Sequence, residues 1–204
     1  AVREGLLIIE ARQQQFGGRQ YTSSRLTTQD KVSFTYGRVD IRAALPKGQG
    51  IWPALWSLGA NFATVGWPRS GEIDIMEMTG GSGREDTVHG TAHWQDSGGV
   101  KRDLGDSYSL SGNATLADGF HVYSLVWTPQ SLTWYIDDIQ YHSMSLDESE
   151  DLSAFQKPFF LIFNVAVGGN WPGSPNSNTL FPQRMLVDYV RVFSEDGAAD
   201  VGLQ

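Results

Sequence analysis

Three carboxylates, Glu72, Asp74 and Glu77, lie within six residues of one another, where the chain reads Gly-Glu-Ile-Asp-Ile-Met-Glu. Side chains of a β-strand alternate between its two faces, so Glu72 and Asp74 share one face and the isoleucines the other. Glu77 is five residues from Glu72 and would fall on the apolar face, where an unpaired carboxylate is costly. One extra residue at Ile75–Met76, a β-bulge, would return Glu77 to the acidic face. The segment therefore predicts three acids on one surface above an apolar core.

Carboxylates arranged in this way suit the hydrolysis of a glycosidic bond, which uses two carboxyl groups on either side of the scissile bond. Glu72 and Glu77 are the natural pair, and Asp74 between them can hydrogen-bond a neighbour and separate the pKa values. Crowded carboxyls cannot all ionise freely, so at least one keeps the proton that a general acid needs. Two other interpretations of the spacing stay open, a solvated acidic strand edge and a calcium site, although calcium prefers flexible loop oxygens.

Several tryptophans lie near these acids in the sequence. Aromatic rings stack on the C–H faces of sugars, and indole N–H groups donate to hydroxyls. Trp171 stands in a loop of small residues, 168–173, which favours ligand contact over core packing. Trp127 and Trp134 lie in alternating, strand-like runs and are predicted core residues. The tryptophans that flank the acids are Trp52, Trp56, Trp67, Trp94 and Trp171.

Histidine is the other residue type that could take part in this chemistry. Alternation along residues 88–94 separates His93 from Val88, Gly90 and Ala92. Beside an acid cluster, His93 could orient the acid/base or bind a sugar hydroxyl, and an ordinary surface or core role is equally open. His121 and His142 show no metal-ligand spacing and are interpreted as structural.

Composition limits the possible partners and the compartment. The 204 residues suit one domain with its own core, and 40% hydrophobic with 19% charged residues indicates a globular protein. A net charge of -8 without a basic cluster argues against nucleic acid and membrane surfaces as partners. The chain has no cysteine, which excludes disulfides and thiolate metal sites. No apolar run reaches the roughly 18 residues of a transmembrane helix, and no signal peptide is visible, as expected of a mature or trimmed chain.

The elements that must position the acids are short β-type runs separated by turn residues. The whole chain holds 23 glycines and 8 prolines, which indicates many turns. Asp137 and Asp138 predict a tight hairpin turn. Only residues 146–155 offer a short helix, which is equally compatible with a loop, and residues 196–204 are predicted to form a flexible tail. The pattern predicts a single all-β sandwich over residues 1–204. The expected strands are residues 6–11, 32–42, 71–77, 88–94, 121–128, 133–136, 159–167 and 185–193.

Across nearly its whole length the chain resembles glycoside hydrolase family sixteen, specifically its laminarinase-like endo-β-1,3-glucanases. With its extra Met76, the motif at residues 71–77 resembles the bulged form found in laminarinase-, agarase- and carrageenase-like members. Lichenase-like and xyloglucan-transferase-like members lack this insertion. Residues 68–70 before the motif and 79–80 after it fit the glucanase branch better than the algal-galactan branch. The segments that carry the resemblance, in family order, are residues 21–25, 34–38, 45–56, 71–77, 88–93, 120–123, 127–128 and 164–173.

The resemblance implies a β-jelly roll of two packed antiparallel sheets with a concave substrate cleft. Carried over by position, Glu72 would be the nucleophile, Asp74 the assisting acid and Glu77 the acid/base of a retaining, endo-acting hydrolase of β-1,3-glucan. Catalysis in this family requires no cofactor. The positions that would contact substrate in the cleft are Trp52, Trp56, His93, Trp171, Arg25 and Asn164.

The chain departs from the family at its start, because members usually carry an upstream segment with an edge strand before the run at residues 6–11. Members often bind calcium on the convex face with that segment and an aspartate like Asp188, so a structural calcium at Asp188 is expected to have only part of its site. We expect a secreted, extracellular monomer whose partner is a β-glucan polysaccharide or oligosaccharide. The alternatives are a hydrolase of mixed-linkage β-glucan, agarose or carrageenan, a mainly transglycosylating enzyme, and a non-catalytic β-glucan-binding module, although such modules usually lose the glutamates.

Overall fold

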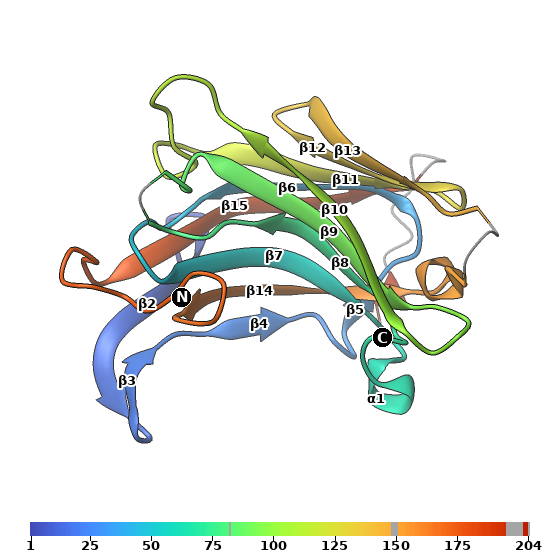
Figure 1. Cartoon of the computed structure of the whole chain (residues 1–204), viewed down its shortest axis with the longest axis horizontal. Coiled ribbons are helices and arrows are strands. Elements are labelled where there is room, and N and C mark those ends of the chain that lie inside the picture. Colours follow the sequence, from blue (N-terminus) through green and yellow to red (C-terminus); the bar gives the residue numbers. More distant parts are fainter. Residues whose placement is uncertain (82, 148–150, 195–201, 204) are drawn as a thin grey trace.

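Two antiparallel β-sheets packed face to face make up the molecule (Figure 1). The computed structural model describes residues 1–81, 83–147, 151–194 and 202–203. The predicted all-β sandwich is confirmed. The tail predicted at residues 196–204 lies outside the described residues, apart from a two-residue strand, β16 (Gly202–Leu203), which pairs with β5 (Val32–Ser33). None of the helices in the described parts of the chain is long and apolar enough to cross a membrane.

The larger sheet, called the outer sheet below, has eight strands in the order β1-β2-β15-β6-β11-β12-β13, with β3 paired to β2. Asp137 and Asp138 join β12 to β13 with φ angles of 48° and 65°, the left-handed pair that a two-residue hairpin needs, so the predicted turn is confirmed. The strands are β1 (Val2–Arg3), β2 (Leu6–Phe16), β3 (Arg19–Thr22), β6 (Gly37–Ala44), β11 (His121–Trp127), β12 (Ser131–Ile136), β13 (Ile139–Ser145) and β15 (Gln183–Phe193).

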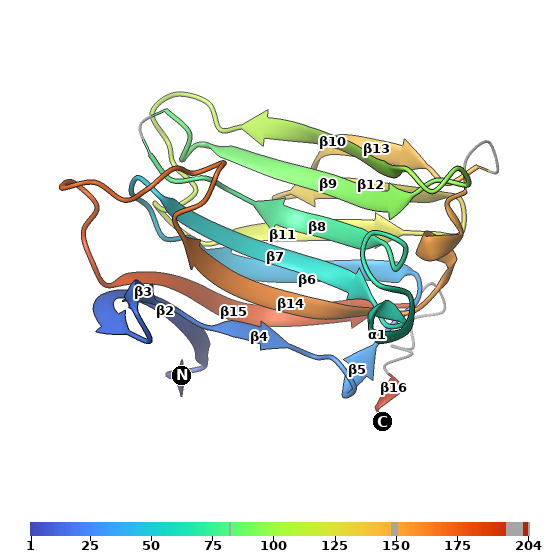
Figure 2. The ribbon, with the colours of Figure 1, turned by 60° about the horizontal axis from the view of Figure 1, so that its bottom comes forward.

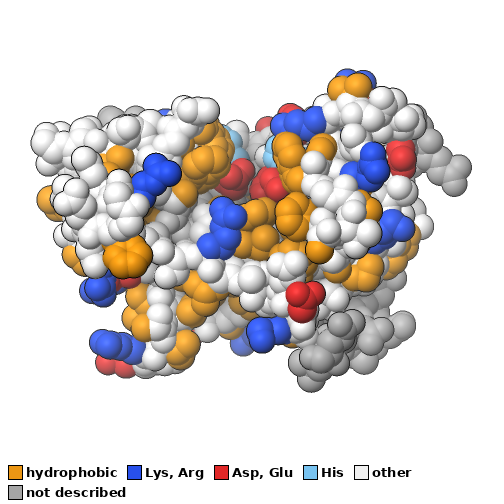
Figure 3. Space-filling model, turned by 90° about the horizontal axis from the view of Figure 1, so that it is seen from below, with side chains coloured by type: hydrophobic (Ala, Val, Ile, Leu, Met, Phe, Trp, Pro, Cys, Tyr) orange, Lys and Arg blue, Asp and Glu red, His pale blue; other side chains and the backbone are white. Residues whose placement is uncertain are grey.

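The second sheet, called the cleft sheet, has six strands in the order β10-β9-β8-β7-β14-β4 (Figure 2). Seen from below, the molecule is hollowed, and acidic and histidine side chains show in the hollow between two raised rims (Figure 3). The strands are β4 (Arg25–Thr27), β7 (Ile51–Gly59), β8 (Glu72–Glu77), β9 (Thr87–Gln95), β10 (Lys101–Ser109) and β14 (Phe159–Val167). The helical segments are α1 (Phe62–Val65) and the 3₁₀ turn η1 (Ser153–Gln156).

The core fills the space between the sheets with large side chains from both. Trp127 and Trp134 of the outer sheet are fully buried, which confirms their predicted core role. The indole N–H of Trp134 donates to the backbone carbonyl of Asp74 across the sandwich, at 2.8 Å. Gly90 of β9 makes room for this ring, since a Cβ there would lie 2.5 Å from Trp134 Cδ1. The outer sheet is therefore bonded directly to the strand that carries the acids.

The strand predicted over residues 32–42 is wrong as one continuous element. Strand β5 ends at Ser33 and β6 begins at Gly37, and Tyr36 between them has φ 63°. Gly37 itself has φ 103°, and a Cβ there would lie 2.1 Å from the carbonyl oxygen of Phe193 on β15. The backbone needs this sharp bend to bring β6 against β15, while the residues on either side keep their alternation.

Strands β7 and β10 and the helix α1 are among the elements that were not predicted, as are the short strands β1, β3 and β4. Strand β7 contains Pro53, and a proline argues against a central strand because it cannot donate to the ladder. Strand β10 is polar and exposed along most of its length, so it lacks an apolar stripe. The helical segment predicted at residues 146–155 is reduced to η1, and residues 148–150 lie outside the described structure. The four-residue helix α1 follows β7.

Candidate active site

Between its paired positions, strand β8 has one residue more than the facing stretches of β7 and β9. Along β9, Asp74 pairs with Thr91 and Glu77 with His89, so three steps of β8 stand opposite two steps of β9. The register with β7 skips Ile75. The predicted bulge is confirmed, and it brings Glu77 back to the face of Asp74.

The three acids share a buried environment that favours their protonated forms. Burial, reinforced by the neighbouring Asp74 charge, raises the pKa of Glu77 to about 8. The indole N–H of Trp52 donates to Glu77 Oε1 at 2.9 Å and acts in the opposite direction. Burial also raises the pKa of Glu72 and of Asp74, and the Asp74 charge raises that of Glu72 further. Protons are therefore held in this cluster near neutral pH, as a general acid requires.

His93 lies against two of the acids. Its Nε2 is 3.1 Å from Asp74 Oδ2 and 3.8 Å from Glu72 Oε1. Burial lowers the pKa of His93, which favours the neutral ring. Each of the three side chains offers one atom within 4.8 Å of the others, a spacing that would also admit a divalent cation. Because His93 Nε2 lies within hydrogen-bond distance of Asp74, we interpret the group as an acid–imidazole network.

Aromatic and polar side chains from β4, β7 and β14 extend the site from Glu72. The indole N–H of Trp56 donates to Asn164 Oδ1 at 2.9 Å, and the Arg25 guanidinium lies 5.2 Å from the centre of the Trp56 ring. Trp56, Arg25 and Glu72 line a cavity of about 350 Å³ together with Trp67. The structure thus brings together the substrate contacts expected on this side of the cleft.

Trp171 packs against Trp52, the residue that donates to Glu77, and against His89. Its ring is edge-on to Trp52, with centroids 5.4 Å apart and planes at 89°, and it meets the His89 ring at 4.9 Å. Trp171 is 41% exposed although it is in contact with both rings. A large exposed ring beside an acid pair is the arrangement that stacks on sugars.

Sequence reasoning missed several residues that line the site. His89 shares the face of His93 by strand alternation and packs on Trp171, so its position was readable although its role was not. Trp67, which was named as a flanking tryptophan but not as a substrate contact, reaches both the cavity and Glu72, to which it donates a hydrogen bond. An apolar floor has no sequence signal, because β14 is buried on both faces and alternation cannot separate them. This floor consists of Leu58, Phe160 and Ile162, with Trp56 packed against it.

Two residues from the sequence analysis lie elsewhere. Trp94 packs in the core against Phe155, with centroids 6.1 Å apart, as the alternation of β9 requires. Asp188 lies on β15 of the outer sheet, where its Oδ2 is 2.6 Å from Arg42 Nη1. A calcium ion takes six to eight oxygen ligands, and the paired Asp188 carboxylate is not in a cluster of three ligating side chains within the described residues. The side chains present therefore do not by themselves make a calcium site, calcium stays a prediction, and no step below depends on it.

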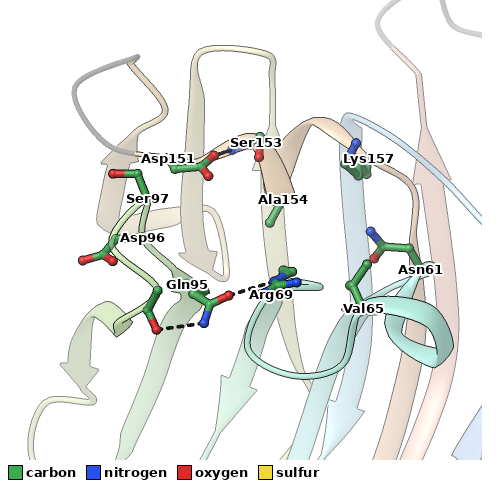
Figure 4. A pocket seen from close by; sticks show the side chains of 11 residues that line it. Asn61, Val65, Arg69, Gln95, Asp96, Ser97, Asp151, Ser153, Ala154 and Lys157 are labelled. Carbon is green, nitrogen blue, oxygen red and sulfur yellow. Dashed lines mark hydrogen bonds between the residues drawn. The ribbon is translucent and has the colours of Figure 1, made fainter.

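A second cavity, of about 380 Å³, lies between α1 and the β9–β10 turn (Figure 4). Arg69 donates to Gln95 Oε1 at 2.9 Å, and Gln95 donates to the carbonyl of Gly99 at 2.8 Å. The three acids do not line this cavity. The chemistry expected from the sequence thus lies in the cleft and not in this second cavity.

Comparison with known proteins places the chain in a family. A β-glucanase of Rhodothermus marinus is 43% identical over 201 residues, which cover 93% of this chain and 68% of that protein. A glucan endo-1,3-β-glucosidase A1 of Niallia circulans is 40% identical over 86% of this chain, which spans only 27% of that longer relative. The laminarinase catalytic domain of Thermotoga maritima, solved with cetyltrimethylammonium bromide, is 46% identical with a TM-score of 0.86, covering 96% of this chain and 80% of that one. The family model for glycosyl hydrolases family 16 matches residues 3–191, and the chain belongs to that family.

Proposed function

We propose that this chain is a retaining, endo-acting glycoside hydrolase that cleaves β-1,3-glucan of the laminarin type. The observation that carries the proposal is the bulged strand β8, which holds Glu72 and Glu77 on one buried face with Glu77 protonated at neutral pH. The relatives named above, a β-glucanase, an endo-1,3-β-glucosidase and a laminarinase, support the substrate.

In the first step the carboxylate of Glu72 attacks the anomeric carbon while Glu77 gives its proton to the departing glycosidic oxygen. The C–O bond to the leaving sugar breaks, and a covalent glycosyl–Glu72 ester forms. In the second step the Glu77 carboxylate takes a proton from water, whose oxygen attacks the same carbon and releases Glu72. Two inversions restore the β-configuration.

Asp74 and His93 support this cycle by controlling protons next to the nucleophile. Glu72 must be ionised to attack, yet its pKa is raised by burial and by the Asp74 charge. A proton held on Asp74 removes that charge and lets Glu72 ionise, and His93 Nε2 lies 3.1 Å from Asp74 to share the proton. We assign Asp74 and His93 this proton-holding role.

Substrate binding follows from the rings and amides along the cleft. Trp56 and Trp171 offer surfaces for the apolar faces of glucose units, and Arg25 and Asn164 offer polar groups for hydroxyls. Catalysis by carboxyl groups alone needs no cofactor. Because a polymeric glucan lies outside the cell, we propose an extracellular, secreted enzyme that acts as a monomer.

The test is the release of reducing ends from laminarin by the wild type and by Glu72→Ala. We expect hydrolysis by the wild type and a loss of about a thousandfold or more in the variant. Equal activity of the two proteins would contradict the assignment of Glu72. Binding of laminarin by the wild type without turnover would favour a glucan-binding module instead.

Two further measurements refine the proposal. Proton NMR of the earliest products should show the β-anomer first, and the α-anomer first would exclude Glu72 as a nucleophile. Product profiles on laminarin and on mixed-linkage lichenan should favour laminarin. A preference for lichenan would move the substrate assignment to mixed-linkage β-glucan.

A further inference from the structure

Three of the six residues in the loop that carries Trp171, residues 168–173, are glycines, which allow many backbone conformations. Gly168, Gly169 and Gly173 have φ angles of 78°, 137° and 72°, values that favour glycine. A loop of this composition loses much conformational freedom when it is fixed. The exposed Trp171 ring nevertheless keeps defined edge contacts with Trp52 and His89. Some other part of the molecule must therefore hold the loop.

Arg84 and Gln49 provide that hold from two separate segments of the chain. Arg84 donates from Nη1 to the carbonyl of Trp171 at 3.4 Å and from Nη2 to the carbonyl of Pro172 at 3.3 Å. Gln49 donates to the same Pro172 carbonyl at 2.6 Å. Arg84 Nη2 also reaches Gln49 Oε1, at 3.2 Å, so the two side chains support each other.

The Arg84 segment is itself fixed to the body of the cleft sheet. Arg84 Nη2 donates to the carbonyl of Gly80 at 2.8 Å. The neighbouring Glu85 accepts backbone N–H bonds from Gly48 at 2.6 Å and Gly81 at 3.0 Å. The contacts therefore connect the segments before β7 and β9 to the Trp171 loop.

We propose that Arg84 is a positioning residue, which with Gln49 fixes the Trp171 loop so that the ring offers a preformed stacking surface for a glucose unit of the β-glucan. This inference rests on the proposed function and extends it to a residue that touches neither the acids nor the reacting bond. A surface fixed before binding spares the entropy that a mobile ring would lose when the sugar arrives.

Arg84 acts through position and not through charge on the acids. The pKa values of Glu72, Asp74 and Glu77 are shifted by burial, by one another, and by His93, Lys101 and tryptophan N–H groups. Arg84 is not among these causes, and its guanidinium donates to carbonyl groups and an amide. Its removal should therefore weaken glucan binding and leave the pH profile of activity in place.

The decisive experiment is a double-mutant cycle between Arg84 and Trp171, made in a Glu72→Gln background so that laminarihexaose binds without turnover. Calorimetry gives the Kd of Arg84→Ala, of Trp171→Ala and of the double variant. We expect each single change to weaken binding about tenfold, and the double variant to bind no more weakly than Trp171→Ala. Arg184→Ala is the matched control, because Arg184 is an exposed arginine that pairs with Glu10 on the outer sheet.

A spectroscopic measurement tests the position of the ring without any sugar. Two indoles 5.4 Å apart couple in the far-ultraviolet circular dichroism spectrum, and both Arg84→Ala and Trp171→Phe should reduce that coupled band. Arg84→Lys keeps the charge but not the planar fork, so it should restore the band only in part. Thermal unfolding of each variant shows whether the fold is retained.

The outcomes separate this inference from the proposed function. If the wild type hydrolyses laminarin but Arg84→Ala keeps both the Kd and the coupled band, the positioning role is wrong and the function stands. Losses that add in the double variant would also overturn it, because Arg84 would then act independently of Trp171. If the wild type neither binds nor hydrolyses laminarin, the proposed function itself fails, and the assignment of the ring to glucan fails with it.

Discussion

The two faces of strand β8 differ in what their side chains do, although both belong to the same six residues. On the core face Ile73 is fully buried between the sheets, and Ile75 and Met76 of the bulge are fully buried as well. On the cleft face Glu72 and Glu77 are only partly buried, yet their pKa values are raised far above the ordinary range. One face stabilises the fold, and the other holds carboxyl groups in an environment that opposes their ionisation.

This difference shows how a rigid core can support an unfavourable arrangement of acids. A carboxyl whose pKa is raised in the folded state adds stability below its unfolded pKa, and that stability is lost as pH rises through the folded pKa. The pKa of Glu77 is about 8 in the folded state against an ordinary 4.5. Its contribution to the stability of the fold therefore decreases as pH rises from about 4.5 to about 8. The apolar face must compensate for that loss. Changes on the two faces should accordingly have opposite effects on stability and activity.

The largest expected effect is that of Glu77→Gln. Without the proton donor, kcat/KM on laminarin should fall about a thousandfold or more. Stability at pH 8 should rise by about 1–2 kcal/mol, because the neutral amide removes the cost of charging a buried carboxyl. Urea unfolding at pH 5 and pH 8 checks this, and the gain should be smaller at pH 5. A variant that is less stable than the wild type at pH 8 would contradict the opposition between the faces.

Next in size is Ile73→Ala on the core face. Removing a fully buried side chain between two sheets should cost about 2–4 kcal/mol of stability. The variant that remains folded at low temperature should keep kcat/KM within about threefold of the wild type, since the acids are unchanged. Thermal unfolding and a laminarin assay well below the transition provide the measurement. Exposed Ile139→Ala is a control for loss of side-chain volume without core packing.

A smaller effect is expected from deletion of Met76, which removes the bulge. The two glutamates then stand four positions apart with Asp74 midway, so regular alternation leaves all three acids on the cleft face. We expect activity to fall about ten- to a hundredfold through altered spacing, less than for Glu77→Gln. Reducing-end assays on both proteins make the comparison. Activity as low as that of Glu77→Gln would show that the bulge has a role beyond returning Glu77 to its face.

The smallest effect is a shift in the pH profile caused by Trp52→Phe. The Trp52 N–H bond stabilises ionised Glu77 and lowers its pKa, so its loss should raise that pKa further. Glu77 then stays protonated to higher pH, and the alkaline limb of kcat/KM should move upward from about pH 8. If the alkaline limb moves to lower pH or stays in place, a group other than Glu77 controls it.

The acids, the bulge and the two core tryptophans could be read from the sequence, because strand alternation is a local rule. Strand β7 could not, since Pro53 lies within it and only its pairing with β8 and β14 makes it a strand. The break at Tyr36 follows from the close approach of Gly37 to Phe193, a contact between residues far apart in the chain. The catalytic and binding roles assigned to Glu72, Asp74, Glu77 and the cleft residues stay predictions.

The support of Trp171 was also beyond the reach of sequence reasoning. Arg84 and Gln49 donate to backbone carbonyls, and such acceptors exist at every position and mark no residue type. Asp188 is a different case, because the family resemblance implies a calcium ligand there, whereas the carboxylate pairs with Arg42 and calcium stays a prediction. Residue types and spacing indicate what chemistry is available, and the tertiary contacts decide which groups meet.

The space left by Gly90 for Trp134 has a consequence for how this site can change over generations. A single substitution that adds a side chain at position 90 would collide with the Trp134 ring and with the hydroxyl of Tyr141, 2.6 Å from the added Cβ. A smaller residue at position 134 would relieve the clash with the ring but not the clash with Tyr141, and it would remove the N–H that donates to the Asp74 carbonyl. A side chain at position 90 therefore requires changes at both Trp134 and Tyr141, and this requirement limits the mutational routes by which the core side of the acid strand could be altered.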